Sequence, residues 1–174
     1  MQHFYESIPG WFNFKKLYSH IIGVLPDDAH IVEVGTWYGC SAAYLAVEII
    51  NSGKPIKFDV VDHFIENGGN RRSFFEEHLK PARHALHAVH EMTSQEAALL
   101  YPDASLDFCM IDAGHELDEI TADIISWLPK IKPGGILSGD DYIPNFPGVI
   151  QAVDAAFGKD VDTSFAPAWV YYVK

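Results

Sequence analysis

Three aspartates and one histidine have the residue types and spacing that suggest chemistry most directly. Asp112 follows the apolar run Leu106–Ile111, and Asp140 and Asp141 follow a second run that begins at Ile136. If the two runs are neighbouring strands, the three carboxylates repel one another, and one must hold a proton unless a cation lies between them. Carboxylate oxygens favour Mg²⁺, Ca²⁺ or Mn²⁺ over zinc. We therefore predict a metal site at Asp112, Asp140 and Asp141; the alternative is that Asp140 or Asp141 caps a turn.

His115 lies three residues after Asp112. An imidazole can remove a proton from a hydroxyl group near neutral pH. A cation held by Asp112 can act as a Lewis acid that lowers the pKa of the same hydroxyl. Catalytic roles are therefore predicted for His115 and Asp112. The alternative for His115 is a solvent-facing position at the start of the next helix.

A loop with two glycines follows the strand-like run His30–Val34 and reads Gly35-Thr36-Trp37-Tyr38-Gly39. Gly35 permits a tight turn, and Gly39 lets a helix begin close to the sheet. The N–H groups at such a helix start can hold a carboxylate or a phosphate. The loop lacks the middle glycine of the dinucleotide pattern, and Trp37 would crowd a pyrophosphate, so a carboxylate ligand fits better. A plain strand–helix turn is the alternative.

Asp62 ends the next apolar run, 23 positions after Gly39. An acid at this point commonly accepts hydrogen bonds from both hydroxyls of a ribose. The alternative is a solvated loop aspartate.

Apolar runs alternate with segments of helical periodicity along the chain. The expected strands are His30–Val34, Ile56–Val61, Leu86–Glu91, Leu106–Ile111 and one that begins at Ile136–Ser138, with Val161–Phe165 and Trp169–Val173 as a hairpin-like pair. The expected helices are Trp11–Val24, Gly39–Asn51, Ser94–Leu100, Glu116–Leu128 and Val149–Phe157, and residues Glu66–His90 form a polar helical excursion. This alternation predicts an α/β, doubly wound, mainly parallel sheet with an antiparallel end. Ligands bind beyond the carboxyl ends of strands in such sheets.

Composition limits the classes of function. The chain has 174 residues, a net charge of −12 and 48% apolar residues. Length predicts a single domain over residues 1–174, and the acidic charge argues against partners with phosphate backbones or anionic membranes. No apolar run approaches the roughly 20 residues of a membrane span, and no signal peptide is visible, so a cytoplasmic protein is expected.

The motifs together resemble the class I S-adenosylmethionine (SAM)-dependent methyltransferases, and more narrowly the metal-dependent O-methyltransferases. Glu33-x-Gly35-x-Trp37-x-Gly39-x-Ser41 is similar to the first motif of catechol O-methyltransferase. The resemblance implies a Rossmann-like sheet of seven strands and a cofactor site at this motif, in which Gly35 and the Trp37 backbone border the methionine part and Ser41 binds its carboxylate. The implied cofactor residues are Glu33, Gly35, Thr36, Trp37, Gly39, Ser41, Asp62, His63, Ser94, Gln95 and Asp112.

Three further positions follow from this resemblance. Asp62 would hold the ribose, although catechol O-methyltransferase has Glu there, and Ser94-Gln95 stands where that family has a Ser-Gln pair near the adenine. Asp112 ends a strand as the first metal ligand of the family does. Asp140-Asp141 stands where the family has Asp-Asn.

The segment from Met92 to Phe157 also resembles bacterial methyltransferases that decorate sugars and antibiotics. Their pattern is similar to Ile111-Asp112-Ala113-x-His115, followed by Lys132-Pro133-Gly134-Gly135 and Gly139-x-Asp141-Tyr142. These relatives have a histidine base at the position of His115, where catechol O-methyltransferase has a lysine.

The sequence thus predicts an enzyme that transfers a methyl group from SAM to a hydroxyl of a sugar, catechol or vicinal diol. A divalent cation is expected to assist the transfer, and Mg²⁺ is the favoured ion. The alternatives are a metal-independent methyltransferase and a non-catalytic SAM-binding accessory subunit. The expected partner is a small hydroxylated acceptor, and neither a nucleic acid nor a membrane is expected as a partner. Whether the chain forms a homodimer is left open by the sequence. Residues 1–28 are expected to form a helical segment that could cover the substrate.

Overall fold

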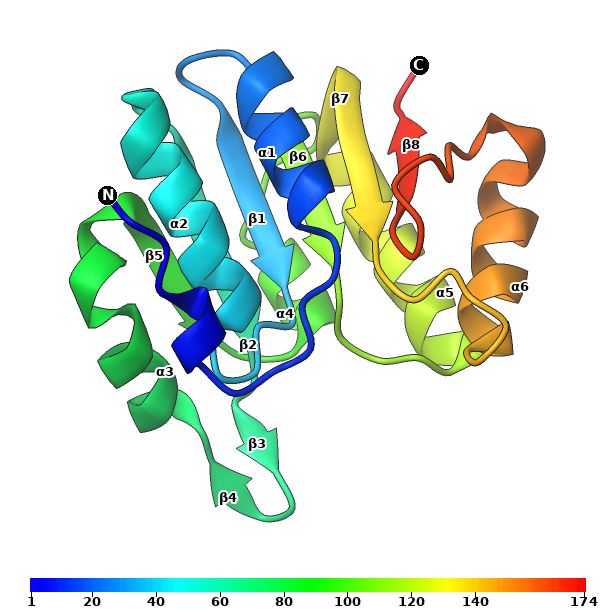
Figure 1. Ribbon diagram of the computed structural model, residues 1–174. Coiled ribbons are helices and arrows are strands. Elements are labelled where there is room, and N and C mark those ends of the chain that lie inside the picture. Colours follow the sequence, from blue (N-terminus) through cyan, green and yellow to red (C-terminus); the bar gives the residue numbers. More distant parts are fainter.

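One mixed sheet organises the chain. The computed structural model describes the backbone of all 174 residues and every side chain except that of Glu66. Within it, six strands form the main sheet in the order β5-β2-β1-β6-β7-β8 (Figure 1). The first five run parallel and β8 runs antiparallel to β7. The strands are β1 (His30–Val34), β2 (Lys57–Asp62), β5 (Leu86–Glu91), β6 (Leu106–Ile111), β7 (Ile131–Gly139) and β8 (Trp169–Tyr172).

Helices cover both faces of this sheet, which confirms the doubly wound α/β prediction. The helices are α1 (Lys15–Val24), α2 (Cys40–Ser52), α3 (Arg72–Leu79), α4 (Ser94–Ala98), α5 (Leu117–Trp127) and α6 (Pro147–Phe157). Successive strand residues point to opposite faces, so Ile31 packs in a core with α1, α2 and α3, whereas Val32 packs in a second core with α4, α5 and α6. Short 3₁₀ helices lie at Tyr5–Ser7, Lys80–Ala85, Leu128–Lys130 and Gly158–Asp160.

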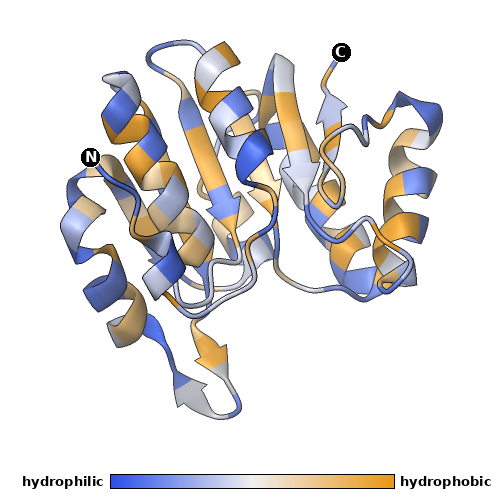
Figure 2. Ribbon diagram, viewed as in Figure 1, coloured by the Kyte–Doolittle hydropathy of each residue, from blue (hydrophilic) through white to orange (hydrophobic). Residues whose placement is uncertain are grey.

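Hydropathy follows the same layers. Hydrophobic residues concentrate along β1 and on α2, whereas the turn between β3 (Ile65–Glu66) and β4 (Gly69–Asn70) is hydrophilic (Figure 2). None of the described helices combines the length and the apolar character that a membrane span requires.

The prediction of a seventh strand is wrong. Val161–Phe165 contributes one isolated bridge, between Asp162 and Val170, in place of a strand. The Asp162 side chain accepts a hydrogen bond from the Ser164 backbone N–H at 2.8 Å. This turn takes the backbone out of the extended conformation directly after the bridge, so the sheet has six strands in the described backbone.

Several boundaries differ from the sequence-based expectation, most by one or two residues. β7 begins at Ile131, five residues before the expected Ile136, because Ile131 also pairs with β6, across a register shift between Leu106 and Phe108.

The first α-helix begins at Lys15, not at Trp11, because the Trp11 ring lies outside the helix and stacks on Trp37 at 5.2 Å. The expected helical excursion Glu66–His90 contains α3, but it starts within the antiparallel β3–β4 hairpin, which projects beyond the carboxyl edge of the sheet (Figure 1).

Gly35 brings the ends of three strands together at that edge. Its backbone N–H donates to the Val61 carbonyl of β2 at 2.8 Å, and the Asp112 N–H donates to the Val34 carbonyl at 2.7 Å. Gly35 has a φ of +83°, and a Cβ atom there would stand 2.0 Å from the Asp112 carbonyl oxygen. A side chain at this position would therefore force β1 and β6 apart.

The variant Gly35→Ala should lower the free energy of unfolding by about 3 kcal/mol, because it adds backbone strain and a clash with Asp112. Gly53→Ala is the matched control, since Gly53 has a φ of +70° with no atom within 4 Å of a built Cβ. The control should lose only about 1 kcal/mol. Urea denaturation of both variants measures the difference, and equal losses would contradict the close approach.

Candidate active site

A cavity of about 840 Å³ lies at the carboxyl edge of the sheet, between the loops that follow the parallel strands. Nearly all residues predicted from the sequence line it. They are Gly35, Thr36, Trp37, Ser41, Asp62, His63, Ser94, Gln95, Asp112, His115, Asp140 and Asp141. The structure thus brings together residues that are up to 106 positions apart in the chain (Gly35 to Asp141).

Glu33 lies beneath the cavity and does not line it. The fully buried carboxylate accepts hydrogen bonds from the Tyr18 hydroxyl at 2.5 Å and from the Ser41 hydroxyl at 2.9 Å. Burial raises the pKa of Glu33 to about 7, although these hydrogen bonds oppose the rise. Glu33 therefore anchors α1 and the first turn of α2 below the site, and the Ser41 hydroxyl is already engaged with it.

Gly39 is also absent from the cavity wall. It precedes α2 with a φ of +90°, and a Cβ atom there would stand 2.4 Å from the Leu79 side chain and 2.9 Å from Phe75. The structure thus places Gly39 where α3 packs against the start of α2. Glycine is needed at this position because a side chain would clash with α3.

Asp62 organises the loop after β1. Its Oδ2 accepts hydrogen bonds from the Thr36 and Trp37 N–H groups at 2.9 and 2.8 Å, and its Oδ1 accepts one from the Phe64 N–H at 2.6 Å. A carboxylate offers roughly four acceptor positions, so these backbone bonds leave about one of them for a ligand. The prediction that Asp62 binds two ribose hydroxyls would require part of this arrangement to change.

Ser94 and Gln95 share a partner that the sequence analysis missed. The Ser94 hydroxyl and the Gln95 amide both donate to Asp123 Oδ1, the latter at 2.7 Å, and Trp127 Nε1 donates to the Ser94 hydroxyl at 2.9 Å. Burial raises the pKa of Asp123 to about 6. The signal was present, because Asp123 is an acid on the buried face of a helix whose other buried residues include Ile120.

The acid cluster differs in part from the predicted set. One ligand atom from each of Asp112, His115 and Asp141 lies within 4.8 Å of the others. His115 Nε2 is 2.7 Å from Asp141 Oδ2, and the Phe146 ring stacks on His115 at 4.6 Å. Asp140 lines the same cavity, and its Oδ1 is buried without a hydrogen-bond partner among the described atoms.

Charge and burial act together on these groups. Burial, followed by the negative charge of Asp140 and other acids, holds the pKa of Asp112 well above its ordinary value. Burial also raises the pKa of Asp140 to about 6. The hydrogen bond with Asp141 raises the pKa of His115. The cluster therefore stabilises positive charge or bound protons in the space between its members.

Aromatic residues border the mouth of the cavity. Trp11 is 84% exposed and stacks on Trp37 with an angle of 10° between the rings, and both residues line the cavity. Ile65 of the β3–β4 hairpin and Arg71 also line it. Neither the β3–β4 hairpin nor Arg71 was among the predicted site residues. The prediction that residues 1–28 cover the substrate stays a prediction.

A family model described as a methyltransferase domain matches residues 32–142. This range includes the strand ends and loops that form most of the cavity. No curated protein matches the sequence.

Several solved structures are similar in fold. CalS11, a TDP-rhamnose 3′-O-methyltransferase of calicheamicin biosynthesis, has a TM-score of 0.70 at 14% identity, over 91% of this chain and 76% of CalS11. The O-methyltransferase NovP has a TM-score of 0.60 at 17% identity, over 93% of this chain and 78% of NovP. A Clostridium thermocellum protein provisionally described as an rRNA-methylase has a TM-score of 0.67 at 13% identity, over 93% and 96% of the two chains. At these identities the likeness shows the fold alone, which hosts different acceptors.

Glu33 predicts a pH dependence of stability. Its pKa of about 7 in the folded protein exceeds the ordinary value of 4.5, so the folded state binds more protons than the unfolded state between these values. Stability from this group therefore falls as the pH rises from 4.5 to 7. In the variant Glu33→Gln the side chain at position 33 carries no charge at any pH. The free energy of unfolding of this variant, relative to that of the unmodified protein, should therefore rise by about 3 kcal/mol across this window.

Urea denaturation at a series of pH values measures this difference. The exposed Glu77 provides the control, because Glu77→Gln should give a curve parallel to that of the unmodified protein. A parallel curve for Glu33→Gln as well would show that Glu33 is ionised in the folded state.

Proposed function

Since this chain belongs to the methyltransferase-domain family, we propose that it transfers the methyl group of SAM to a hydroxyl group of a small molecule, assisted by a divalent cation. The observation that carries this proposal is the meeting of Asp112, His115 and Asp141 in a cavity at the carboxyl edge of the sheet. Class I methyltransferases share this fold, and the enzyme class follows from the family.

The cavity is large enough to hold SAM. Its volume of about 840 Å³ lies within the range of small-ligand sites. The helix α2 begins at this cavity without a side-chain cap, so its first turn can receive the carboxylate of the methionine part. Thr36, Trp37, Ser41 and Asp62 are the residues that we propose to hold the donor, with Ser94 and Gln95 nearer its adenine.

The carboxylates fit a divalent cation. Asp112, Asp140 and Asp141 would hold it, since the buried Asp140 Oδ1 has no described partner and the three negative charges otherwise oppose one another. Oxygen ligands of this kind favour Mg²⁺. When bound, the cation would polarise an acceptor hydroxyl and lower the pKa of that hydroxyl.

His115 is the proposed base. Its Nε2 faces Asp141 Oδ2 at 2.7 Å, so the proton on Nε2 is held by the carboxylate and Nδ1 is the basic nitrogen. Phe146 stacks on the ring, which fixes its plane. His115 would accept the hydroxyl proton as the acceptor oxygen attacks the methyl group, and the sulfur of the donor leaves as a neutral thioether.

A small acceptor with neighbouring hydroxyls suits this arrangement best. Two oxygens on adjacent carbons can reach one cation together, which is a property of catechols and of sugars. Trp11 and Trp37 present flat aromatic surfaces at the mouth, against which either kind of ring can pack. The net charge of −12 opposes an RNA acceptor.

A metal-independent methyltransferase is the second candidate. The specific observation in its favour is the His115–Asp141 pair itself, because a histidine oriented by a carboxylate can act as a base without a cation. Sensitivity to a chelator separates the two candidates.

Turnover should be measured as release of S-adenosylhomocysteine, with catechols, vicinal diols and nucleotide sugars as acceptors. We expect that a chelator abolishes turnover and that Mg²⁺ restores it. The variant Asp112→Asn should lose turnover by about 100-fold or more, and His115→Gln should lose a comparable amount because a positioned base contributes on this scale. Both variants should still bind S-adenosylhomocysteine.

The exposed Asp118 gives a matched control, since Asp118→Asn removes a nearby acid that does not line the cavity. Its turnover should be unchanged. Full activity of the unmodified protein and of Asp112→Asn in chelator would contradict the cation and favour the metal-independent reaction.

A further inference from the structure

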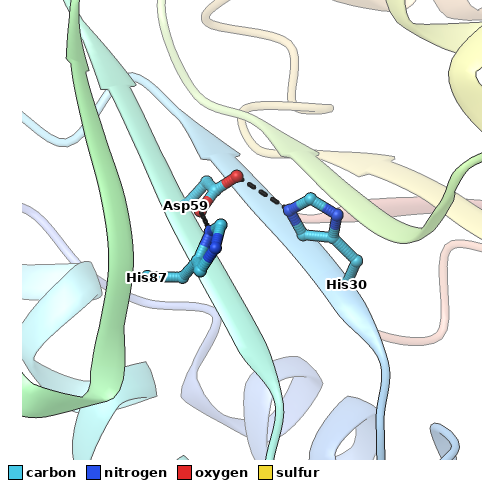
Figure 3. Close-up of side chains that lie close together, drawn as sticks. All are labelled: His30, Asp59 and His87. Atoms are coloured by element: carbon cyan, nitrogen blue, oxygen red, sulfur yellow. Dashed lines mark hydrogen bonds and ion pairs between the residues drawn. The ribbon is translucent and has the colours of Figure 1, made fainter. Parts of the chain in front are cut away.

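Two histidines and one aspartate meet on three neighbouring strands, outside the cavity described above. His30 is the first residue of β1, Asp59 is the third residue of β2, and His87 is the second residue of β5. Figure 3 shows the Asp59 carboxylate between the two imidazole rings. All three positions lie toward the amino ends of their strands, so the cluster faces away from the carboxyl edge.

The distances within this cluster are short. His30 Nε2 lies 2.7 Å from Asp59 Oδ2, and His87 Nδ1 lies 2.7 Å from Asp59 Oδ1. One ligand atom of each residue lies within 4.8 Å of the other two. Two imidazole nitrogens and one carboxylate form a donor set that zinc and neighbouring transition metals prefer, unlike the carboxylate-rich set in the first cavity.

An irregularity in the sheet places His87. In the pairing of β2 with β5, Phe58 stands opposite Leu86 but Asp59 stands opposite Ala88, so His87 is an extra residue in β5. A bulge of this kind changes the direction of side chains locally. The bulge therefore lets the His87 ring reach Asp59 while the strands continue in register on either side.

The surroundings suit an ion with an open coordination position. Asp59 is 2% exposed, and the Tyr101 hydroxyl donates to its Oδ2 at 2.9 Å. Such a hydrogen bond orients the carboxylate, as neighbouring polar groups do for carboxylates that bind a metal. The His87 side chain is 53% exposed, which provides a route from solvent. A cavity of about 250 Å³, which His90 also lines, opens beside the three residues and shares no described lining residue with the first cavity.

From these observations we propose that His30, Asp59 and His87 bind one transition-metal ion of the zinc class, with water in the remaining position. Ligand atoms in a tetrahedral zinc site lie ~3.3 Å apart. Because His30 and His87 face different oxygens of Asp59, side-chain rotation must bring both nitrogens around the one oxygen that binds the ion. The ion would link β5, β2 and β1. It would stabilise this half of the sheet without a part in methyl transfer.

The test is titration of the untagged full chain with Zn²⁺ by calorimetry, and with Co²⁺ by visible absorption, which reports tetrahedral nitrogen and oxygen ligands. The titration uses Asp112→Asn, because that variant weakens the carboxylate cluster of the first cavity and leaves His30, Asp59 and His87 unchanged. We expect one saturable equivalent in it. The variants His87→Gln and His30→Gln should each weaken this binding by ~100-fold or more. The matched control is His84→Gln, since His84 is exposed and outside the cluster, and it should leave this binding unchanged.

Thermal melting gives a second readout. In the Asp112→Asn background, Zn²⁺ at about 100 times its dissociation constant should raise the melting temperature by ~5–10 °C. Adding His87→Gln should abolish this rise while the circular dichroism without metal stays native. Absence of a saturable equivalent in Asp112→Asn, or binding and a thermal rise that persist when either histidine variant is added to it, would show a metal-free hydrogen-bonded cluster and overturn the proposal.

Discussion

Repulsion between carboxylates crowded at one edge of the sheet is the interaction on which the functional site depends. Parallel strands end side by side there, and five acids gather at or below their ends: Glu33, Asp62, Asp112, Asp140 and Asp141. The protein offsets two of the charges locally, with backbone N–H groups for Asp62 and His115 for Asp141. Glu33, Asp112 and Asp140 keep raised pKa values. A divalent cation and a positively charged methyl donor are the ligands that such a site favours.

Much of the fold could be predicted because the relevant signals are local. β1, β5 and β6 have the predicted bounds. For β1 and β6 the reason is that short β-branched or apolar runs bounded by polar residues and turns specify buried strands. The β3–β4 hairpin was missed because two-residue strands leave no periodicity to detect. The seventh strand failed because a side-chain hydrogen bond of Asp162 ends the extended backbone, and such a competition is not visible in hydropathy.

The candidate site was predictable where it depends on topology and not where it depends on side-chain partners. Strand-end residues such as Asp112 and Asp141 line the cavity because carboxyl ends of parallel strands meet. The bond from Gln95 to Asp123 depends on how α4 packs against α5. The position of His87 depends on a register shift within the sheet. Neither relation follows from spacing along the chain, so only the folded structure could reveal them.

Binding of S-adenosylhomocysteine tests the central claim, a methyl-donor site at the carboxyl edge of the sheet, without knowledge of the acceptor. Calorimetric titration should give one saturable equivalent. At about 100 times the dissociation constant the melting temperature should rise by roughly 5–10 °C, whereas NAD⁺ should produce no rise because Trp37, which lines the cavity, crowds the position of a pyrophosphate. If S-adenosylhomocysteine produces no binding heat and no rise in melting temperature, the account is contradicted.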